Sequence, residues 1–279
     1  MNDSELKFCM IKSVLRNIPL PSLKETKSRR IIVSLTSYGK RLENVDLTIR
    51  SILLQSVRPN KIILWLDSSI SSNMLPHRLT LLKNKGLDIR FNCMDLKGHK
   101  KYFYVMQEYP DSLIITVDDD VVYYPDTLKT LIDTSRKYPN AVVARRVNQL
   151  TFLNNSIMPY SEWNFNCRQY LKPRMDLLAT GVGGVLYPPS CIPDGAFNID
   201  SIIKNAISAD DIWLKFHEVS KGIKTVWASN RHTHPFEMPG SQTLALFSTN
   251  IDKGINDLVI KKLLKEYDMH ATLFEEDAC

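Results

Sequence analysis

Strand-like and helix-like segments alternate over the first half of the sequence, and this alternation constrains the fold more than any other feature. Short apolar runs, typical of buried strands, occupy residues 31–35, 61–66, 87–93 and 112–117. Segments with apolar residues at helical spacing lie between them, over residues 44–57, 76–85 and 100–108. The alternation predicts an α/β fold with a mostly parallel sheet flanked by helices. Such sheets bind ligands at the carboxyl ends of their strands.

Polar side chains follow these expected strands at the points where the strands end. They are Thr36, Ser37 and Tyr38 after the first strand, Asp67 after the second, and Asp118, Asp119 and Asp120 after the fourth. Three adjacent carboxylates repel one another unless a cation or hydrogen-bond donors offset their charge. Carboxylate oxygens suit Mg²⁺ or Mn²⁺, which commonly bridge one or two carboxylates to substrate phosphates. We therefore expect a metal and phosphate site here, with a solvated strand end as the alternative.

Two other classes of nucleotide-binding protein also place polar residues at a strand end. A P-loop NTPase requires the pattern GxxxxGK[ST], which the sequence does not contain. A Rossmann dehydrogenase requires GxGxxG soon after the first strand, where only Gly39 stands. The sequence therefore favours neither class.

The second half of the chain is less regular. Its expected elements are helices at residues 126–137, 209–219 and 257–267 and strands at residues 141–147 and 223–228. A polar aromatic stretch over residues 151–174 has little periodicity, and long irregular loops are often functional. Aromatic rings that could face a sugar, or pack in the core, belong to Tyr160, Trp163, Phe165 and Trp213.

A glycine-rich segment lies between these elements, at residues 180–185. Gly181, Gly183 and Gly184 permit close backbone approach or unusual dihedral angles, but their spacing is not that of a phosphate-binding loop. We expect these three glycines to form a wall of the sugar or acceptor pocket. A tightly packed strand is the alternative.

An acidic pair, Asp210 and Asp211, opens the helix expected at residues 209–219. Free backbone N–H groups and the helix dipole favour carboxylates at a helix start, so capping accounts for one of the two. The other is a candidate base for an acceptor hydroxyl. Farther along, Arg231 could bind phosphate oxygens. In an extended segment, the nearby His232 and His234 would point to the same side.

The stretch LIITVDDDVVYYPD, which begins at Leu113, resembles the DxD region of GT-A-fold glycosyltransferases, particularly the family 2-type group. A proline and an aspartate follow the DxD motif at the distance seen in that family. Further matches in family order are Thr36, Ser37 and Tyr38, then Asp67, then Lys97, Lys100 and Lys101, then Asp210 and Asp211. The resemblance covers about residues 30–234. The chain departs from it in a Leu-Thr-Ser-Tyr start and an Asp-Asp pair, which leaves the nucleotide and the family branch open.

The resemblance implies a GT-A (Rossmann-like) fold in a single catalytic domain over residues 30–236. It implies donor binding by Thr36, Tyr38, Arg41, Asp67, Lys100, Lys101, Asp118, Asp119, Gly183 and Gly184. It implies Mn²⁺ or Mg²⁺ held by Asp118 and Asp120, completed by His232 or His234. Asp211 would be the catalytic base, with Asp210 as its companion.

The function that follows is metal-dependent transfer of a sugar from a nucleoside-diphosphate donor, expected to be a UDP-sugar, to a hydroxyl of a glycan or lipid-linked oligosaccharide. A base at Asp211 implies inversion, and the resemblance suggests bacterial surface polysaccharide synthesis. A sugar nucleotidyltransferase would carry a glycine-rich basic loop after the first strand, where only Gly39, Lys40 and Arg41 stand. A non-catalytic nucleotide- or glycan-binding protein would not need the acidic pair.

Charge and composition add limits on partners. The net charge of +6 suits anionic partners but is too diffuse to indicate nucleic acid. Residues 1–29 form a basic arm that either contacts an anionic membrane surface or stays solvated, and residues 237–279 form a helical extension. No apolar run approaches the roughly 20 residues of a membrane span, so we expect a cytoplasmic protein, peripheral at most on the inner face of the membrane. The five scattered cysteines indicate neither disulfides nor zinc.

Overall fold

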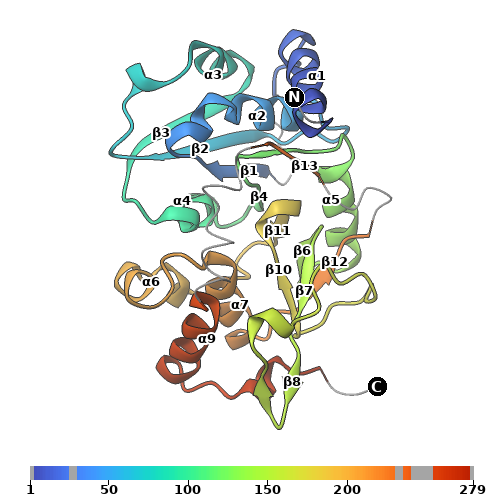
Figure 1. The fold of residues 1–279 in the computed structure, drawn as a ribbon, viewed down its shortest axis with the longest axis vertical. Coiled ribbons are helices and arrows are strands. Elements are labelled where there is room, and N and C mark those ends of the chain that lie inside the picture. Colours follow the sequence, from blue (N-terminus) through green and yellow to red (C-terminus); the bar gives the residue numbers. More distant parts are fainter. Residues whose placement is uncertain (1–2, 25–29, 230–234, 240–253, 277–279) are drawn as a thin grey trace.

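A seven-stranded sheet lies at the centre of the computed structural model, which describes residues 3–24, 30–229, 235–239 and 254–276 (Figure 1). Its strand order is β12-β6-β11-β4-β1-β2-β3. The strands are β1 (Ile31–Thr36), β2 (Lys61–Asp67), β3 (Leu87–Cys93), β4 (Leu113–Thr116), β6 (Val142–Ala144), β11 (Val185–Tyr187) and β12 (Thr225–Trp227). Every neighbouring pair is parallel except the two that β11 makes with β4 and β6. The predicted mostly parallel sheet is confirmed.

Helices cover both faces of this sheet. They are α2 (Val45–Leu53), α3 (His77–Thr80), α4 (Lys100–Glu108), α5 (Thr127–Lys137), α6 (Ile199–Asn205), α7 (Asp210–Ser220) and α9 (Ile255–Glu266). Because side chains alternate along a strand, Ile32 and Val33 of β1 belong to different apolar layers. The Val33 layer includes α2, α3 and α5, whereas the Ile32 layer includes α4, α7 and α9. The predicted Rossmann-like α/β class, in a single domain, is confirmed.

Several local elements differ from the sequence-based expectation. The helix expected at residues 76–85 is one turn of α3 followed by a 3₁₀ segment, Leu81–Lys85, which ends at Gly86 in the left-handed region (φ 105°). The strand expected at residues 141–147 divides in two at Arg145 and Arg146. Its second part, β7 (Val147–Gln149), pairs with β10 (Leu177–Ala179) in a separate antiparallel ribbon. Elements of three residues are too short to show a period, which is why β10 and β11 were not predicted.

The irregular stretch after β7 contains little regular structure, as its lack of periodicity indicated. A small hairpin joins β8 (Phe152–Leu153) to β9 (Ser156–Ile157), and a 3₁₀ turn spans Tyr160–Glu162. Another two-stranded ribbon pairs β5 (Val121–Val122) with β13 (Phe236–Glu237). This ribbon brings the chain beyond β12 next to the triple aspartate, because the N–H of Met238 donates to the carbonyl of Asp120 (2.8 Å).

The basic arm expected at the N-terminus contains a helix, α1 (Asp3–Asn17), which has no buried residue. It contacts α2 through Arg16, whose guanidinium lies 2.8 Å from the buried carboxylate of Asp46. Arg50 and Arg78 also pair with Asp46, so α1 adds one of three cations to this group. No helix among the described residues is long and apolar enough to cross a membrane.

The strand order defines where a ligand can enter. From β1 the sheet continues through β2 to β3 on one side, and through β4 on the other. Parallel sheets bind ligands in the crevice at such a reversal of strand order, outside the carboxyl ends. Here the reversal lies between β1, which ends at Thr36, and β4, which leads into Asp118.

Candidate active site

A cavity of about 910 Å³ opens at this edge of the sheet. Its walls come from the carboxyl ends of β1, β2 and β4, from the first turns of α4 and α7, and from segments around β7 and β10. These elements are far apart in the sequence. They meet because β11 is reversed, so that its amino end joins the carboxyl ends of β4 and β6.

The triple aspartate divides into one buried and two accessible carboxylates. The side chain of Asp119 is 5% exposed, whereas those of Asp118 and Asp120 are 29% and 14% exposed. Arg41 lies 2.9 Å from Asp119 and 3.2 Å from Asp120, and burial raises the pKa of Asp119 despite this cation. The hydroxyl of Thr48 donates to the carbonyls of Asp119 and Val121. The segment is therefore fixed from beneath, with Asp118 and Asp120 facing the cavity.

Lys101, near the start of α4, connects the triple aspartate to the acidic pair. Its ammonium lies 3.2 Å from Asp118, 2.9 Å from Asp210 and 3.9 Å from Asp211. Burial alone would lower the pKa of Lys101, but Asp118, then Asp210 and Asp211, raise it well above its usual value. The lysine is thus a permanent internal cation between two groups of carboxylates.

The two members of the acidic pair have opposite electrostatic environments. Burial alone would raise the pKa of Asp210, but Lys101 outweighs it and the pKa is lowered. Burial raises the pKa of Asp211 to about 7, opposed by Lys101 and supported by the neighbouring charges of Asp210 and Asp118. Paired carboxyls whose pKa values are driven apart indicate a division of acid–base roles. Asp211, 30% exposed, can accept a proton near neutral pH.

The capping role expected for this pair is wrong. The N-cap of α7 is Ala209, and no side chain caps it. Asp210 instead pairs with Lys101, and Asp211 accepts a hydrogen bond from the backbone N–H of Gly181 (3.2 Å). Capping was expected because the sequence does not show that a lysine approaches the first turn of α7.

Gly181 is required by this arrangement. A Cβ atom added there would lie 2.5 Å from the Lys101 ammonium and 2.8 Å from a carboxylate oxygen of Asp118. Only hydrogen at this position leaves room for both groups. The backbone therefore approaches the charged cluster closely, and its N–H group reaches Asp211.

A second ion pair lies at the β2 side of the cavity. The buried ammonium of Lys100 is 3.1 Å from Asp67 and 2.7 Å from Asp95. Burial alone would raise the pKa of Asp67, but hydrogen bonds from Ser69 and then Lys100 lower it. Asp67 is consequently an ionised hydrogen-bond acceptor on the cavity wall.

Two lysines in the first turn of α4 oppose the helix dipole, which is positive at that end. The neighbouring carboxylates offset this cost in the free protein. The first turn of α7 adds a second positive helix end to the same cavity. This part of the cavity is therefore suited to an added anion, such as a diphosphate, that arrives with its own cation.

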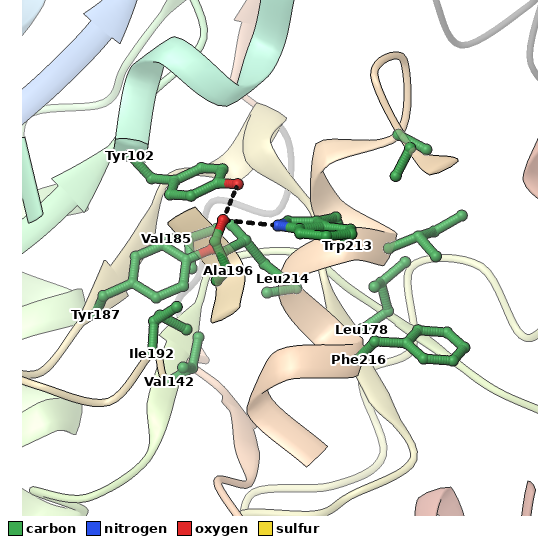
Figure 2. Packing of buried hydrophobic residues seen from close by; sticks show 14 of the residues in the cluster. Tyr102, Val142, Leu178, Val185, Tyr187, Ile192, Ala196, Trp213, Leu214 and Phe216 are labelled. Carbon is green, nitrogen blue, oxygen red and sulfur yellow. Dashed lines mark hydrogen bonds between the residues drawn. The ribbon is translucent and has the colours of Figure 1, made fainter. Parts of the chain in front are cut away.

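A shared carbonyl holds α4 and α7 in register (Figure 2). The hydroxyl of Tyr102 and the indole N–H of Trp213 both donate to the carbonyl oxygen of Ala196, at 3.3 and 3.0 Å. Tyr102 is adjacent to Lys101, and Trp213 is two residues beyond Asp211. The contact fixes the helix that carries the lysine relative to the helix that carries the acidic pair.

The structure brings most of the predicted residues to one cavity. Those that line it are Thr36, Tyr38, Arg41, Asp67, Lys100, Lys101, Asp118, Asp119, Asp120, Asp210 and Asp211. Gly183 and Gly184 do not line it. A Cβ at Gly183 would lie 2.9 Å from the backbone nitrogen of Arg146, and Gly184, with φ 85°, leads directly into β11. These two glycines pack against the wall rather than form it, in agreement with the packed-strand alternative.

The outcome differs among the other predicted residues. Arg231, His232 and His234 fall outside the described residues. Tyr160 lines the cavity, whereas Trp213 is fully buried in the core. The sequence analysis did not select Arg146, Asn148 or Thr180, which also line it. Arg146 could have been predicted from the sequence, because it follows the carboxyl end of an apolar strand, as Asp118 does.

A divalent metal can be accommodated by two of these carboxylates. Among the described residues, no three acidic, histidine or cysteine side chains converge on one point. Mg²⁺ and Mn²⁺ sites of the substrate-bridging type need only one or two carboxylates, with phosphates and water completing the shell. Asp118 and Asp120 fit this type because both are accessible from the cavity, at the side where α4 presents its positive end.

The comparisons with known proteins give a resemblance of fold and no family. No protein-family model and no curated protein sequence matches the chain. A mannosyltransferase from Pyrobaculum calidifontis, solved with GDP-Man and Mn²⁺, is similar with a TM-score of 0.47 and 10% identity, over 94% of this chain and 76% of that one. S. aureus TarS 1–349 is similar at 0.46 and 12%, over 78% of this chain and 63% of that one. A 4-diphosphocytidyl-2C-methyl-D-erythritol synthase is similar at 0.47 and 7%, over 79% of this chain and 98% of that one.

Proposed function

We propose that the protein is a GT-A-type glycosyltransferase, which transfers a sugar from a nucleoside-diphosphate donor to a hydroxyl of a glycan acceptor. One observation carries the proposal. Lys101 joins the carboxylate Asp118, at the end of β4, to the acidic pair at the start of α7, where Asp211 has a pKa of about 7. A phosphate-binding region and a base thus share one cavity.

The donor's nucleoside belongs over the ends of β1 and β2 in this proposal. Asp67 is ionised there and can accept hydrogen bonds from a ribose hydroxyl or a base N–H group. Thr36 and Tyr38 line the same wall, and Tyr38 is 39% exposed. We expect a UDP-sugar as the donor.

The donor's diphosphate belongs between the triple aspartate and the first turn of α4. Asp118 and Asp120 would hold Mn²⁺ or Mg²⁺, which when bound neutralises charge on the leaving diphosphate. Arg41 pairs with Asp120 in this structure and can transfer its hydrogen bonds to a phosphate oxygen. The fixed charge of Lys101 stabilises the same region without any movement of its own.

The proposed chemistry is a single displacement at the anomeric carbon. The acceptor hydroxyl forms the new C–O bond while the bond to the diphosphate oxygen breaks, and the diphosphate leaves with the electron pair. The hydroxyl proton passes to Asp211. Attack on the face opposite the leaving group inverts the configuration. The net charge of +6 supports an anionic surface, such as that of a lipid-linked polysaccharide at a membrane, as the setting.

Calorimetry of UDP with Mn²⁺ or with EDTA tests the donor site. We expect binding with Mn²⁺ and a large loss of affinity with EDTA, and we expect Asp120→Ala to lose the metal-dependent part. Asp133→Ala is the matched control, because Asp133 is an exposed aspartate that pairs with Lys129 and Arg136 on the surface of α5. Equal UDP affinity with Mn²⁺ and with EDTA would contradict the metal assignment.

Incubation with a panel of UDP-sugars tests the reaction class. Release of UDP, alone or with added glycans, supports glycosyl transfer. Release of pyrophosphate from a nucleoside triphosphate and a sugar 1-phosphate would instead show a nucleotidyltransferase. Binding of UDP without any turnover of the panel would favour a non-catalytic binding protein.

A further inference from the structure

The cavity has a second half that the proposed donor site does not use. It lies over β11, β6 and the β7–β10 ribbon, on the side of β4 away from β1 and β2. Its lining includes Arg146, Asn148, Tyr160 and Thr180. With the donor over β1, β2 and β4, this half is the place for the acceptor.

Arg146 differs from the other partly buried cations of the cavity. Arg41, Lys100 and Lys101 each pair with at least one carboxylate. Arg146 forms no ion pair with any residue that the structure describes, and its buried Nε has no hydrogen-bond partner there. A buried donor without a partner is costly, and a guanidinium offers a planar fork that matches a carboxylate or a phosphate.

The backbone around Arg146 is fixed, so the side chain enters the cavity from a rigid base. Its carbonyl accepts hydrogen bonds from the backbone N–H (3.1 Å) and the hydroxyl (3.3 Å) of Thr180. Gly183 packs closely against its backbone nitrogen. Because the backbone is already ordered, only the side chain has to be ordered when the guanidinium binds an anion.

The groups near Arg146 are neutral and polar. The amide of Asn148 donates to the hydroxyl of Tyr160 (3.3 Å), and burial raises the pKa of Tyr160 to about 12, so this hydroxyl stays protonated. The Tyr160 ring packs on Trp163 and Phe165, with centroids 4.7 and 5.4 Å apart. This half therefore offers hydroxyl and amide groups for sugar hydroxyls, and one guanidinium for a negative group.

The backbone of Arg146 lies apart from the strand end to which the donor's diphosphate is assigned. Arg146 follows β6, which β11 separates from β4, so the two strand ends are about 10 Å apart at ordinary strand spacing. Thr180 precedes Gly181, whose N–H donates to Asp211 (3.2 Å), and this places the second half of the cavity next to the proposed base. An acceptor whose hydroxyl reaches Asp211 would present its neighbouring groups here.

We propose that Arg146 binds a carboxylate or phosphate group on the acceptor sugar, so that the acceptor is an acidic glycan. The proposal rests on the proposed function, because it assigns the second half of the cavity to the acceptor. It names a chemical class, namely hexoses that carry one negative group.

Three small probes test it: methyl β-D-glucuronide, glucose 6-phosphate and the neutral methyl β-D-glucoside. Calorimetry with UDP and Mn²⁺ present should show at least one anionic probe binding about tenfold or more tightly than the neutral one. Arg146→Gln should abolish this preference and leave UDP affinity unchanged. Arg146→Lys should retain part of it, because it keeps the charge and loses the fork. Arg136→Gln, at an exposed arginine of α5, is the matched control and should change neither the preference for anionic probes nor the UDP affinity.

Two results would overturn the proposal. One is a wild-type protein that binds no anionic probe more tightly than the glucoside. The other is Arg146→Gln weakening UDP as much as it weakens the anionic probes, which would assign Arg146 to the donor. Thermal unfolding of both Arg146 variants verifies that they are folded. Failure of UDP itself to bind contradicts the proposed function, whereas the probe titrations repeated without nucleotide still decide the role of Arg146.

Discussion

Asp210 and Asp211 are adjacent, occupy the same helical turn and face the same lysine, yet their pKa values shift in opposite directions. The ammonium of Lys101 lies 2.9 Å from Asp210 but 3.9 Å from Asp211. Asp210 is thus fixed as the ionised partner of the lysine. Asp211 remains the carboxyl that can exchange a proton. The difference of about 1 Å in these two distances accompanies the division of roles.

Asp211→Asn should reduce the rate of transfer by about 10²- to 10⁴-fold and leave UDP affinity near wild type, because the amide cannot accept the proton. Steady-state assays with a turned-over donor, together with UDP calorimetry, measure both quantities. Asp210→Asn is the second variant to compare, and it should weaken the ion pair with Lys101. An active Asp211→Asn protein beside an inactive Asp210→Asn protein would show that the base is Asp210.

The pH dependence follows from the same group. A base must be deprotonated, so kcat/KM should fall as the pH drops below the pKa of Asp211, which is about 7 in the free protein. A bound divalent cation adds positive charge near Asp118 and moves this limb to lower pH. A pH–rate profile from pH 5 to 9 measures it. A flat profile over this range would rule out Asp211 as the base.

Rising pH should lower the stability of the folded protein, whereas it should increase kcat/KM. The folded protein keeps the Asp211 proton up to pH about 7, whereas the unfolded chain releases it near the ordinary aspartate pKa of 3.8. Between these values the folded state binds more protons, so raising the pH lowers the stability that this group contributes. Asp211→Asn removes the effect and should raise Tm above pH 7 by about 2–4 °C per kcal/mol gained. Scanning calorimetry at pH 5 and pH 8 compares the two proteins, and a variant that is less stable at pH 8 would contradict the assignment.

At the scale of elements, the site depends on three segments meeting: the first turn of α4, the first turn of α7 and the turn before β11. The Ala196 carbonyl joins the two helices through Tyr102 and Trp213. Gly181 brings the turn before β11 against both. The position of the charged cluster therefore depends on backbone approach as much as on the side chains themselves.

Gly181→Ala tests this approach. The added methyl would meet Lys101 and Asp118, so we expect the ion pairs to be displaced and the rate of transfer to fall by about tenfold or more. Gly222→Ala is a useful contrast, because its Cβ meets nothing within 4 Å although its φ is 70°. That control should lose about 1–2 kcal/mol of stability and keep its rate. Equal rates in the two variants would show that the close approach at Gly181 has no functional consequence.

At the scale of the whole molecule, two apolar layers hold a sheet whose strand order reverses beneath the cavity. Ligands that bind there connect parts of both layers. Arg41 lies just before α2 and Thr48 lies within it, on one face of the sheet, whereas α4 and α7 cover the other face. Ligand binding should therefore be visible as stabilisation of the entire fold.

UDP with Mn²⁺, at about one hundred times its Kd, should stabilise the folded protein by about 2.7 kcal/mol. This corresponds to a rise in Tm of roughly 5–10 °C for a chain of this size. Differential scanning fluorimetry measures the shift, and EDTA should abolish most of it. The same rise in the presence of EDTA would mean that nucleotide binding does not use a metal.

The sequence predicted those parts of the fold whose signals are local. Apolar runs identified β1 to β4, and Asp67 and Asp118 were placed at a cavity because parallel strands share a carboxyl edge. The reversed strand β11 has only three residues, and no period indicates its direction. Likewise, the association of Arg146 with Thr180 depends on pairing between β7 and β10, which only the folded chain shows. The predicted capping role at Asp210 was wrong because the sequence does not show that a lysine more than one hundred residues away pairs with this aspartate.

The position of the cavity also determines where the protein can be attached to a surface. With the cavity at one edge of the sheet, the opposite edge carries short exposed connections, including Asp111, the Pro139–Asn140 turn and Ser190. A peptide tag or a dye-labelled cysteine inserted at residues 139–140 would anchor the protein to a sensor surface with its cavity turned toward the solution.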